Sequence, residues 1–155
     1  MSSLPGQGQI DPRQIQMPEP NWILMTLLKN TWKKGGQTIA DLPDRAYFDT
    51  KWYTGANEVE IHVRPLSEKV KRWGVGSTKR PHWTICEVWI WTRDIKMRWA
   101  VLKELERILA LKAIKPTQDI ERIDYWNVDY WQDKDPIGAG ELFRAKIDVQ
   151  LFWVK

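Results

Sequence analysis

Cysteine, long apolar runs and a recognisable leader are all scarce or absent in this chain of 155 residues. The single cysteine, Cys86, excludes an internal disulfide framework and a zinc site built from four cysteines. The longest apolar stretch, Trp22–Leu28, is far shorter than the roughly 18 residues that cross a membrane. The first 20 residues lack the basic head and apolar core of a secretory signal. We therefore expect a soluble domain in the cytoplasm, without membrane contact.

Motifs for catalysis are equally scarce. The chain lacks the phosphate-binding loop GxxxxGK[ST] and a GxGxxG that opens a helix. His82 precedes Cys86 by four residues, about 13 Å on a strand that rises about 3.3 Å per residue, which is too far for one metal ion. His62 falls in the polar phase of a strand, and we expect it to be exposed. We predict no enzyme, no metal and no cofactor; a nuclease-like site at Asp124 and Asp129 is the alternative.

Positive charge is concentrated in one segment of a chain whose net charge is +4. Residues 57–115 hold 13 basic and 7 acidic side chains, whereas residues 116–155 hold 5 and 8. Residues 64–80 carry six cations against the single carboxylate of Glu68, and these cations are Arg64, Lys69, Lys71, Arg72, Lys79 and Arg80. Such a patch attracts polyanions through a salt-sensitive term that ignores sequence. A solvated loop without a partner is the other interpretation.

Helical periodicity predicts two helices within a single domain, residues 21–155, that follows an extended N-terminal arm, residues 1–20. The first helix begins at Pro20 or Asn21 and is stopped by glycines at 35 and 36. The second begins after Asp94, which can cap it, and ends before Pro116. Its apolar stripe, which we expect to be core, consists of Ile95, Trp99, Leu102, Leu105 and Leu109.

Alternation of apolar and polar residues predicts the strands. Residues 57–64 form a strand that Pro65 ends, and residues 65–82 form a long basic loop. Residues 83–92 are apolar in both phases, and residues 119–131 and 141–153 make a closing hairpin. Short strand pieces are possible at 38–40 and 46–48. We therefore predict an α+β fold: an antiparallel sheet of about four strands packed by one long helix, plus an N-terminal helix and the long basic loop.

Tryptophan is unusually frequent, with 11 residues. Tryptophan is enriched where protein surfaces meet. Trp89 and Trp91 share one face of the strand 83–92, where they are either core or a subunit contact, and Trp73 in the basic loop either anchors in a neighbour or stacks on bases. The predicted subunit-interface residues are Trp73, Trp83, Trp89 and Trp91.

The order of these elements resembles the tail-completion or tail-terminator proteins of long-tailed phages and related archaeal viruses. The shared features are an apolar N-terminal helix (Trp22–Trp32), a strand that runs into a long loop (Val59–Arg64), a strand that leads into an amphipathic helix (Trp83–Leu111) and a closing hairpin (Ile120–Trp153). The resemblance is one of pattern and covers residues 20–155.

The resemblance implies a homohexameric ring that ends the tail tube and joins it to the head connector, with genomic DNA in its lumen. Its partners would be copies of itself, the tail tube protein and the head–tail connector protein. It would act in the virion after assembly in the host cytoplasm, with the six cations of residues 64–80 facing DNA or a neighbouring protein. The alternative is a small nucleic-acid-binding module that uses the same basic loop.

Overall fold

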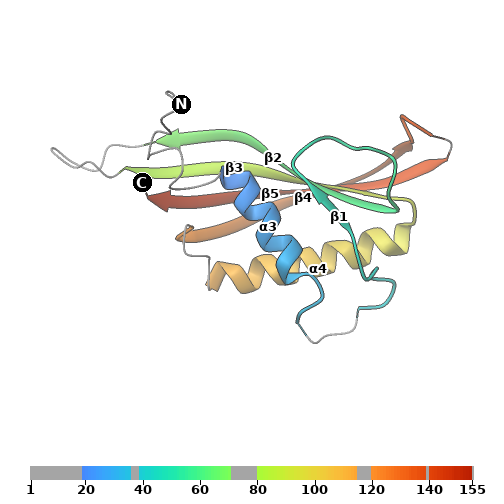
Figure 1. Ribbon diagram of the computed structural model, residues 1–155, viewed down its shortest axis with the longest axis horizontal. Helices are drawn as coiled ribbons and strands as arrows, with labels where there is room; N and C mark the ends of the chain where they lie inside the picture. The colour runs from blue at the N-terminus through green and yellow to red at the C-terminus, as the bar shows by residue number, and fades with distance from the viewer. Residues whose placement is uncertain (1–18, 36–38, 71–79, 115–119, 139, 155) are drawn as a thin grey trace, which may run out of the picture.

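The computed structural model describes residues 19–35, 39–70, 80–114, 120–138 and 140–154. Within these ranges the chain forms two helices and five strands in one sheet, so the predicted α+β class is confirmed (Figure 1). The predicted N-terminal arm lies outside the described residues up to residue 18. In chain order the elements are α3 (Pro20–Thr31), β1 (Tyr47–Asp49), β2 (Val59–Val70), β3 (Pro81–Thr92), α4 (Ile95–Ile114), β4 (Arg122–Lys134) and β5 (Glu141–Val154).

The sheet has the strand order β1-β2-β3-β5-β4. Strands β2, β3, β5 and β4 are antiparallel neighbours, which are the four strands that alternation predicts. The prediction of an all-antiparallel sheet is wrong in one respect, because β1 adds a fifth strand parallel to β2. β1 is only three residues long, too short for a periodic signal to identify its partner.

Strand β2 does not stop at Pro65, as the sequence predicts, but continues to Val70. The register with β3 shifts between Pro65 and Ser67, and a bulge is one of the few places where a sheet tolerates proline. β3 correspondingly begins at Pro81 rather than Trp83. The described residues of the predicted loop 65–82 are therefore part of the sheet, where β2 pairs with β3 and β3 pairs in turn with β5. Residues 71–79 lie outside the described part of the chain.

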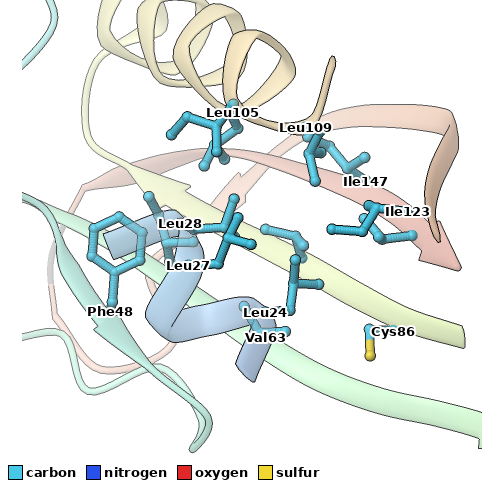
Figure 2. Packing of buried hydrophobic residues seen from close by; sticks show 14 of the residues in the cluster. Leu24, Leu27, Leu28, Phe48, Val63, Cys86, Leu105, Leu109, Ile123 and Ile147 are labelled. Carbon is cyan, nitrogen blue, oxygen red and sulfur yellow. The ribbon is translucent and has the colours of Figure 1, made fainter. Parts of the chain in front are cut away.

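Both helices pack on the same face of the sheet, α3 against β2 and α4 against β3, β5 and β4. Figure 2 shows Leu105 and Leu109 of α4 and the leucines of α3 directed toward Val63, Ile123 and Ile147 of the strands. Cys86 lies in this core, where burial raises the pKa of its thiol to about 12. At neutral pH the thiol is therefore protonated and unreactive. We call this side the helix-covered face.

The start of α4 follows the sequence prediction, and Leu102, Leu105 and Leu109 of the predicted stripe are buried, but Ile95 and Trp99 are exposed. The Asp94 carboxylate accepts hydrogen bonds from the backbone N–H groups of Lys96 (2.7 Å) and Met97 (3.4 Å), so it caps the helix. Trp99, predicted to be core, is 55% exposed. At 100° per residue Trp99 lies about 120° around the helix from Leu105, the centre of the buried stripe. That stripe consists of Val101, Leu102, Leu105, Ile108 and Leu109.

Candidate assembly surfaces

The face of the sheet opposite the helices, the open face, is covered by no helix within the described residues. Its middle strands present Glu87, Trp89 and Trp91 from β3, which lie directly opposite Asp148, Lys146 and Arg144 of β5 in that order. Residues 50–58, which connect β1 to β2, cross one end of this face (Figure 1). The open face therefore carries aromatic and charged side chains in place of an aliphatic core.

An aromatic cluster forms where residues 50–58 meet the open face. The Tyr53 ring stacks on Trp91 with centroids 5.3 Å apart, and Trp89 stacks on Trp91 at 5.7 Å. The Trp52 ring meets Trp91 edge-on at 5.0 Å and remains 47% exposed. Trp91 itself is only 2% exposed, so it offers a partner almost no surface and acts as core of its own chain. Trp52, which no sequence pattern singles out, is the exposed member of this aromatic cluster.

Two arginines complete the aromatic cluster. The Arg144 guanidinium lies 5.0 Å from the Trp91 ring centroid and 4.8 Å from that of Trp131, and it pairs with Asp133 at 2.7 Å. The Arg64 guanidinium lies 4.4 Å from the Trp52 centroid. Guanidinium groups over indole faces are attracted by the ring quadrupole. Two cations of the same chain thus already lie over the rings of the aromatic cluster.

His62, expected to be exposed, is fully buried, as is its neighbour Glu60. The His62 Nε2 atom lies 2.8 Å from a Glu60 carboxylate oxygen, and Nδ1 lies 2.6 Å from the backbone carbonyl of Lys51. Thr54 donates to Glu60 through its backbone N–H (2.9 Å) and its hydroxyl (2.7 Å). Burial raises the pKa of Glu60, but these hydrogen bonds outweigh that effect and hold it below its usual value. The polar phase of β2 is thus buried because residues 50–58 fold back over it.

A charged cluster occupies the centre of the open face. The Lys146 ammonium lies 3.0 Å from Glu87, 3.6 Å from Asp148 and 3.8 Å from Asp129. The hydrogen bond to Glu87 raises the pKa of Lys146. Asp124 instead pairs with Arg122 at 3.3 Å. It lies opposite Gln150, four residues along β5 from Lys146, the residue opposite Asp129, so about 13 Å of strand separates the two carboxylates of the alternative nuclease-like site. Within the described residues, no three or more histidine, cysteine or carboxylate side chains are placed so that they could hold a metal ion.

The basic segment is divided between the far ends of β2 and β3, which belong to the sheet, and the undescribed residues. Arg64 and Lys69 on β2 and Arg80 before β3 are exposed. Lys71, Arg72, Trp73 and Lys79 lie outside the described residues. Trp83, predicted to face a neighbouring subunit, is half-buried and contacts Phe152 of β5 at 5.1 Å between centroids. His82 stacks on Trp153 at 3.9 Å. The described end of this part of the sheet thus carries exposed cations and pairs of aromatic rings.

A groove opens on the outer side of α4, with a volume of about 610 Å³. Its apolar lining includes Ile39, Ile95 and Trp99, the last two more than half exposed. Lys96, Lys103 and Arg107 border it, and the Lys103 ammonium lies 4.8 Å from the Trp99 ring centroid. Asp41 adds a carboxylate to the lining. We call this the α4 groove; it is apolar with a mainly basic border.

Exposed acidic side chains, in contrast to the basic border of the groove, lie along β4, an edge strand of the sheet. Trp126 is 43% exposed and Tyr130 is 50% exposed. Asp124 and Asp129 on the same strand are also exposed. Asp124, Trp126 and Asp129 lie opposite Gln150, Asp148 and Lys146 on the open face, whereas Tyr130 lies opposite Ala145 on the helix-covered face, where the Arg98 guanidinium is 5.4 Å from its ring centroid. The β4 edge, as we name Asp124, Trp126 and Asp129, therefore combines a large aromatic side chain with negative charge. The sequence pattern indicates the acidity of this region but not its exposed rings.

No protein-family model matches the chain, and a search of curated proteins finds no match. None of the helices in the described part of the chain is long and apolar enough to cross a membrane.

Proposed function

We propose that this protein is a non-enzymatic structural subunit that assembles with copies of itself into a ring, which ends the tail tube of a virion and joins it to the head connector. The observation that carries the proposal is the exposure of large aromatic side chains on two separate surfaces, the α4 groove and the β4 edge. Subunits of a ring contact one another through two different patches, related by a rotation that closes. A protein that acts as a monomer would not need two such patches.

Energetics favour assembly over isolation. Half-exposed side chains on these surfaces include Trp99, Ile95 and Trp126. Burying apolar area contributes about 25 cal/mol per Å², and each large aromatic side chain offers about 150–250 Å² in all. Contiguous exposed apolar groups on a protein surface mark interaction sites. Covering them with a second copy removes them from water without any additional partner.

The assignment to a virion tail rests on element order. An apolar N-terminal helix, a strand continuing into a basic connection, a strand leading into a long helix and a closing hairpin follow one another as in tail-terminator proteins. In such a ring the exposed cations Arg64, Lys69 and Arg80 would line the lumen or rim, where they hold DNA without reading its sequence.

Oligomeric state is the direct test. Size-exclusion chromatography with light scattering should give the mass of a closed ring, which we expect to be a hexamer, and electron microscopy should show the ring at the ends of purified tail tubes. A strict monomer at high protein concentration that also fails to join tail tubes contradicts the proposal. If the protein forms a ring that does not bind tail tubes, the proposed assembly is supported and the assignment to a virion tail is wrong.

A second function has its own supporting observation. The exposed Trp52 ring lies under the Arg64 guanidinium, and Lys69 follows on the same strand, an arrangement of ring and cations that suits a single-stranded nucleic acid. Binding of an unstructured oligonucleotide should weaken steeply with salt. Charge reversal at Arg64, Lys69 and Arg80 should lower the salt slope by about one for each phosphate that the variant no longer neutralises. An unchanged slope removes this second candidate.

A further inference from the structure

We infer that the α4 groove of one copy receives the β4 edge of the next copy. This inference rests on the proposed ring and names the two patches that build it. Each subunit would offer its groove to one neighbour and its β4 edge to the other, so that the contact is heterologous and can close by rotation.

Charge complementarity selects the occupant of the groove. Two cations on its border, Lys96 and Lys103, are exposed on α4. The third, Arg107, is already held by Glu104 at 2.7 Å. An incoming surface therefore needs carboxylates to meet the two lysines and an apolar group to cover Trp99. A partner of that character is recognised by electrostatic steering as well as by buried area.

The β4 edge has that character. It presents the exposed carboxylates Asp124 and Asp129 together with the ring of Trp126 on the open face. Asp124 pairs with the exposed Arg122 at 3.3 Å, and exposed pairs of this kind are weak. Asp129 lies 3.8 Å from Lys146, a cation that Glu87 holds more closely. Both carboxylates can therefore turn to a lysine of a neighbour at little cost.

The position of the two patches fits a ring contact. The α4 groove lies on the outer side of α4, the helix that packs on the helix-covered face, whereas Asp124, Trp126 and Asp129 of β4 lie on the open face. The patches thus belong to different parts of the subunit, and one copy can engage two neighbours at once. This separation is what distinguishes a ring from a closed two-fold dimer.

The contact is made through side chains rather than by joining sheets. The register between β4 and β5 shifts at Asn127, whose φ of 56° lies in the left-handed region. A bulge in an edge strand twists its free hydrogen-bonding groups away from a straight partner strand. Strand pairing along β4 is thereby discouraged, while the Trp126 ring and the two carboxylates on either side of the bulge remain available for docking.

Charge reversal in two places tests the inference. A groove variant, Lys96→Glu with Lys103→Glu, and an edge variant, Asp124→Lys with Asp129→Lys, should each weaken assembly about tenfold or more, because like charges then face one another. Lys146 retains Glu87 and Asp148 in the edge variant, so the open face stays balanced. Combining all four changes, or mixing the two variants, should restore assembly, because the charges are complementary again.

The control reverses two exposed lysines elsewhere, Lys29→Glu with Lys34→Glu, and should leave assembly unchanged. Circular dichroism shows whether each variant is folded. Light scattering across a concentration series gives the assembly constant. If the wild-type chain is monomeric throughout, the proposed function fails. If it forms rings that all variants preserve, or if the combined variant is not rescued, the ring stands and this interface is wrong.

Discussion

The two faces of the sheet are stabilised in different ways. The helix-covered face is packed by aliphatic side chains such as Leu28 of α3, Leu105 of α4 and Ile147 of β5, each fully buried between the helices and the sheet. The open face has no helix over it within the described residues and relies on indole rings, guanidinium groups and a buried His–Glu pair. The same sheet thus has an aliphatic core on one side and a partly exposed layer of polar and aromatic side chains on the other.

Deleting an aliphatic side chain on the helix-covered face should produce the largest effect. Leu105→Ala removes a fully buried side chain between α4 and the sheet, and we expect the free energy of unfolding to fall by about 4 kcal/mol. Urea denaturation followed by circular dichroism measures this loss. A loss below about 1 kcal/mol would mean that α4 is not held by this core.

Truncating the central ring of the open face should cost somewhat less. Trp91→Ala removes the ring on which Tyr53, Trp89 and Trp52 pack, and we expect a loss of about 3 kcal/mol. The same denaturation series measures it, with Trp91→Phe as the variant that retains a ring. If Trp91→Ala costs nothing, the open face is not a second core and the contrast between faces disappears.

The Glu60 carboxylate should make the stability of the open face pH-dependent. Its pKa is lower in the folded chain than its ordinary value of 4.5, so its contribution is present above pH 4.5 and is lost as pH falls through the folded pKa. Removing the charge by Glu60→Gln should cost about 2 kcal/mol near neutral pH and flatten the decline in stability on acidification. Unfolding curves from about pH 3 to about pH 7, a range that spans this titration, compare the two chains. Equal slopes would contradict this role.

Removing the exposed ring of the aromatic cluster should have the smallest effect on folding. Trp52→Ala takes away a side chain that is 47% exposed, and we expect less than about 1 kcal/mol in the isolated subunit. The same variant should weaken oligonucleotide binding if the second candidate function holds, since each stacked base contributes about 1–3 kcal/mol. A large destabilisation would place Trp52 in the core rather than on a binding surface.

Local signals in the sequence predict much of this architecture. Pro20 marks the start of α3, Asp94 caps α4, and strict alternation identifies β5, because each depends on short-range geometry. The rotation of α4 about its axis does not follow from the sequence, since the stripe through Trp99 overlaps the one through Ile108 and only packing decides between them. The continuation of β2 past Pro65 depends on a bulge, which needs the partner strand to define it.

The candidate surfaces follow less directly from the sequence than the fold does. Trp89 and Trp91 share a strand face, as alternation indicates, but the packing of Tyr53 over Trp91 depends on residues 50–58. Gly55, with φ of 77°, lets that segment turn in a conformation that other residues rarely adopt. The burial of His62 has the same origin. A period-two pattern does not indicate that the connection just before a strand folds back across its polar side.

The seclusion of Cys86 has a practical consequence for labelling. Because the only thiol of the chain is enclosed and protonated at neutral pH, maleimide reagents will leave the folded protein untouched. A cysteine introduced at position 96 or 124 would then be the sole reactive handle. Fluorophores or bifunctional crosslinkers attached there could report on neighbouring subunits without a prior cysteine-free background.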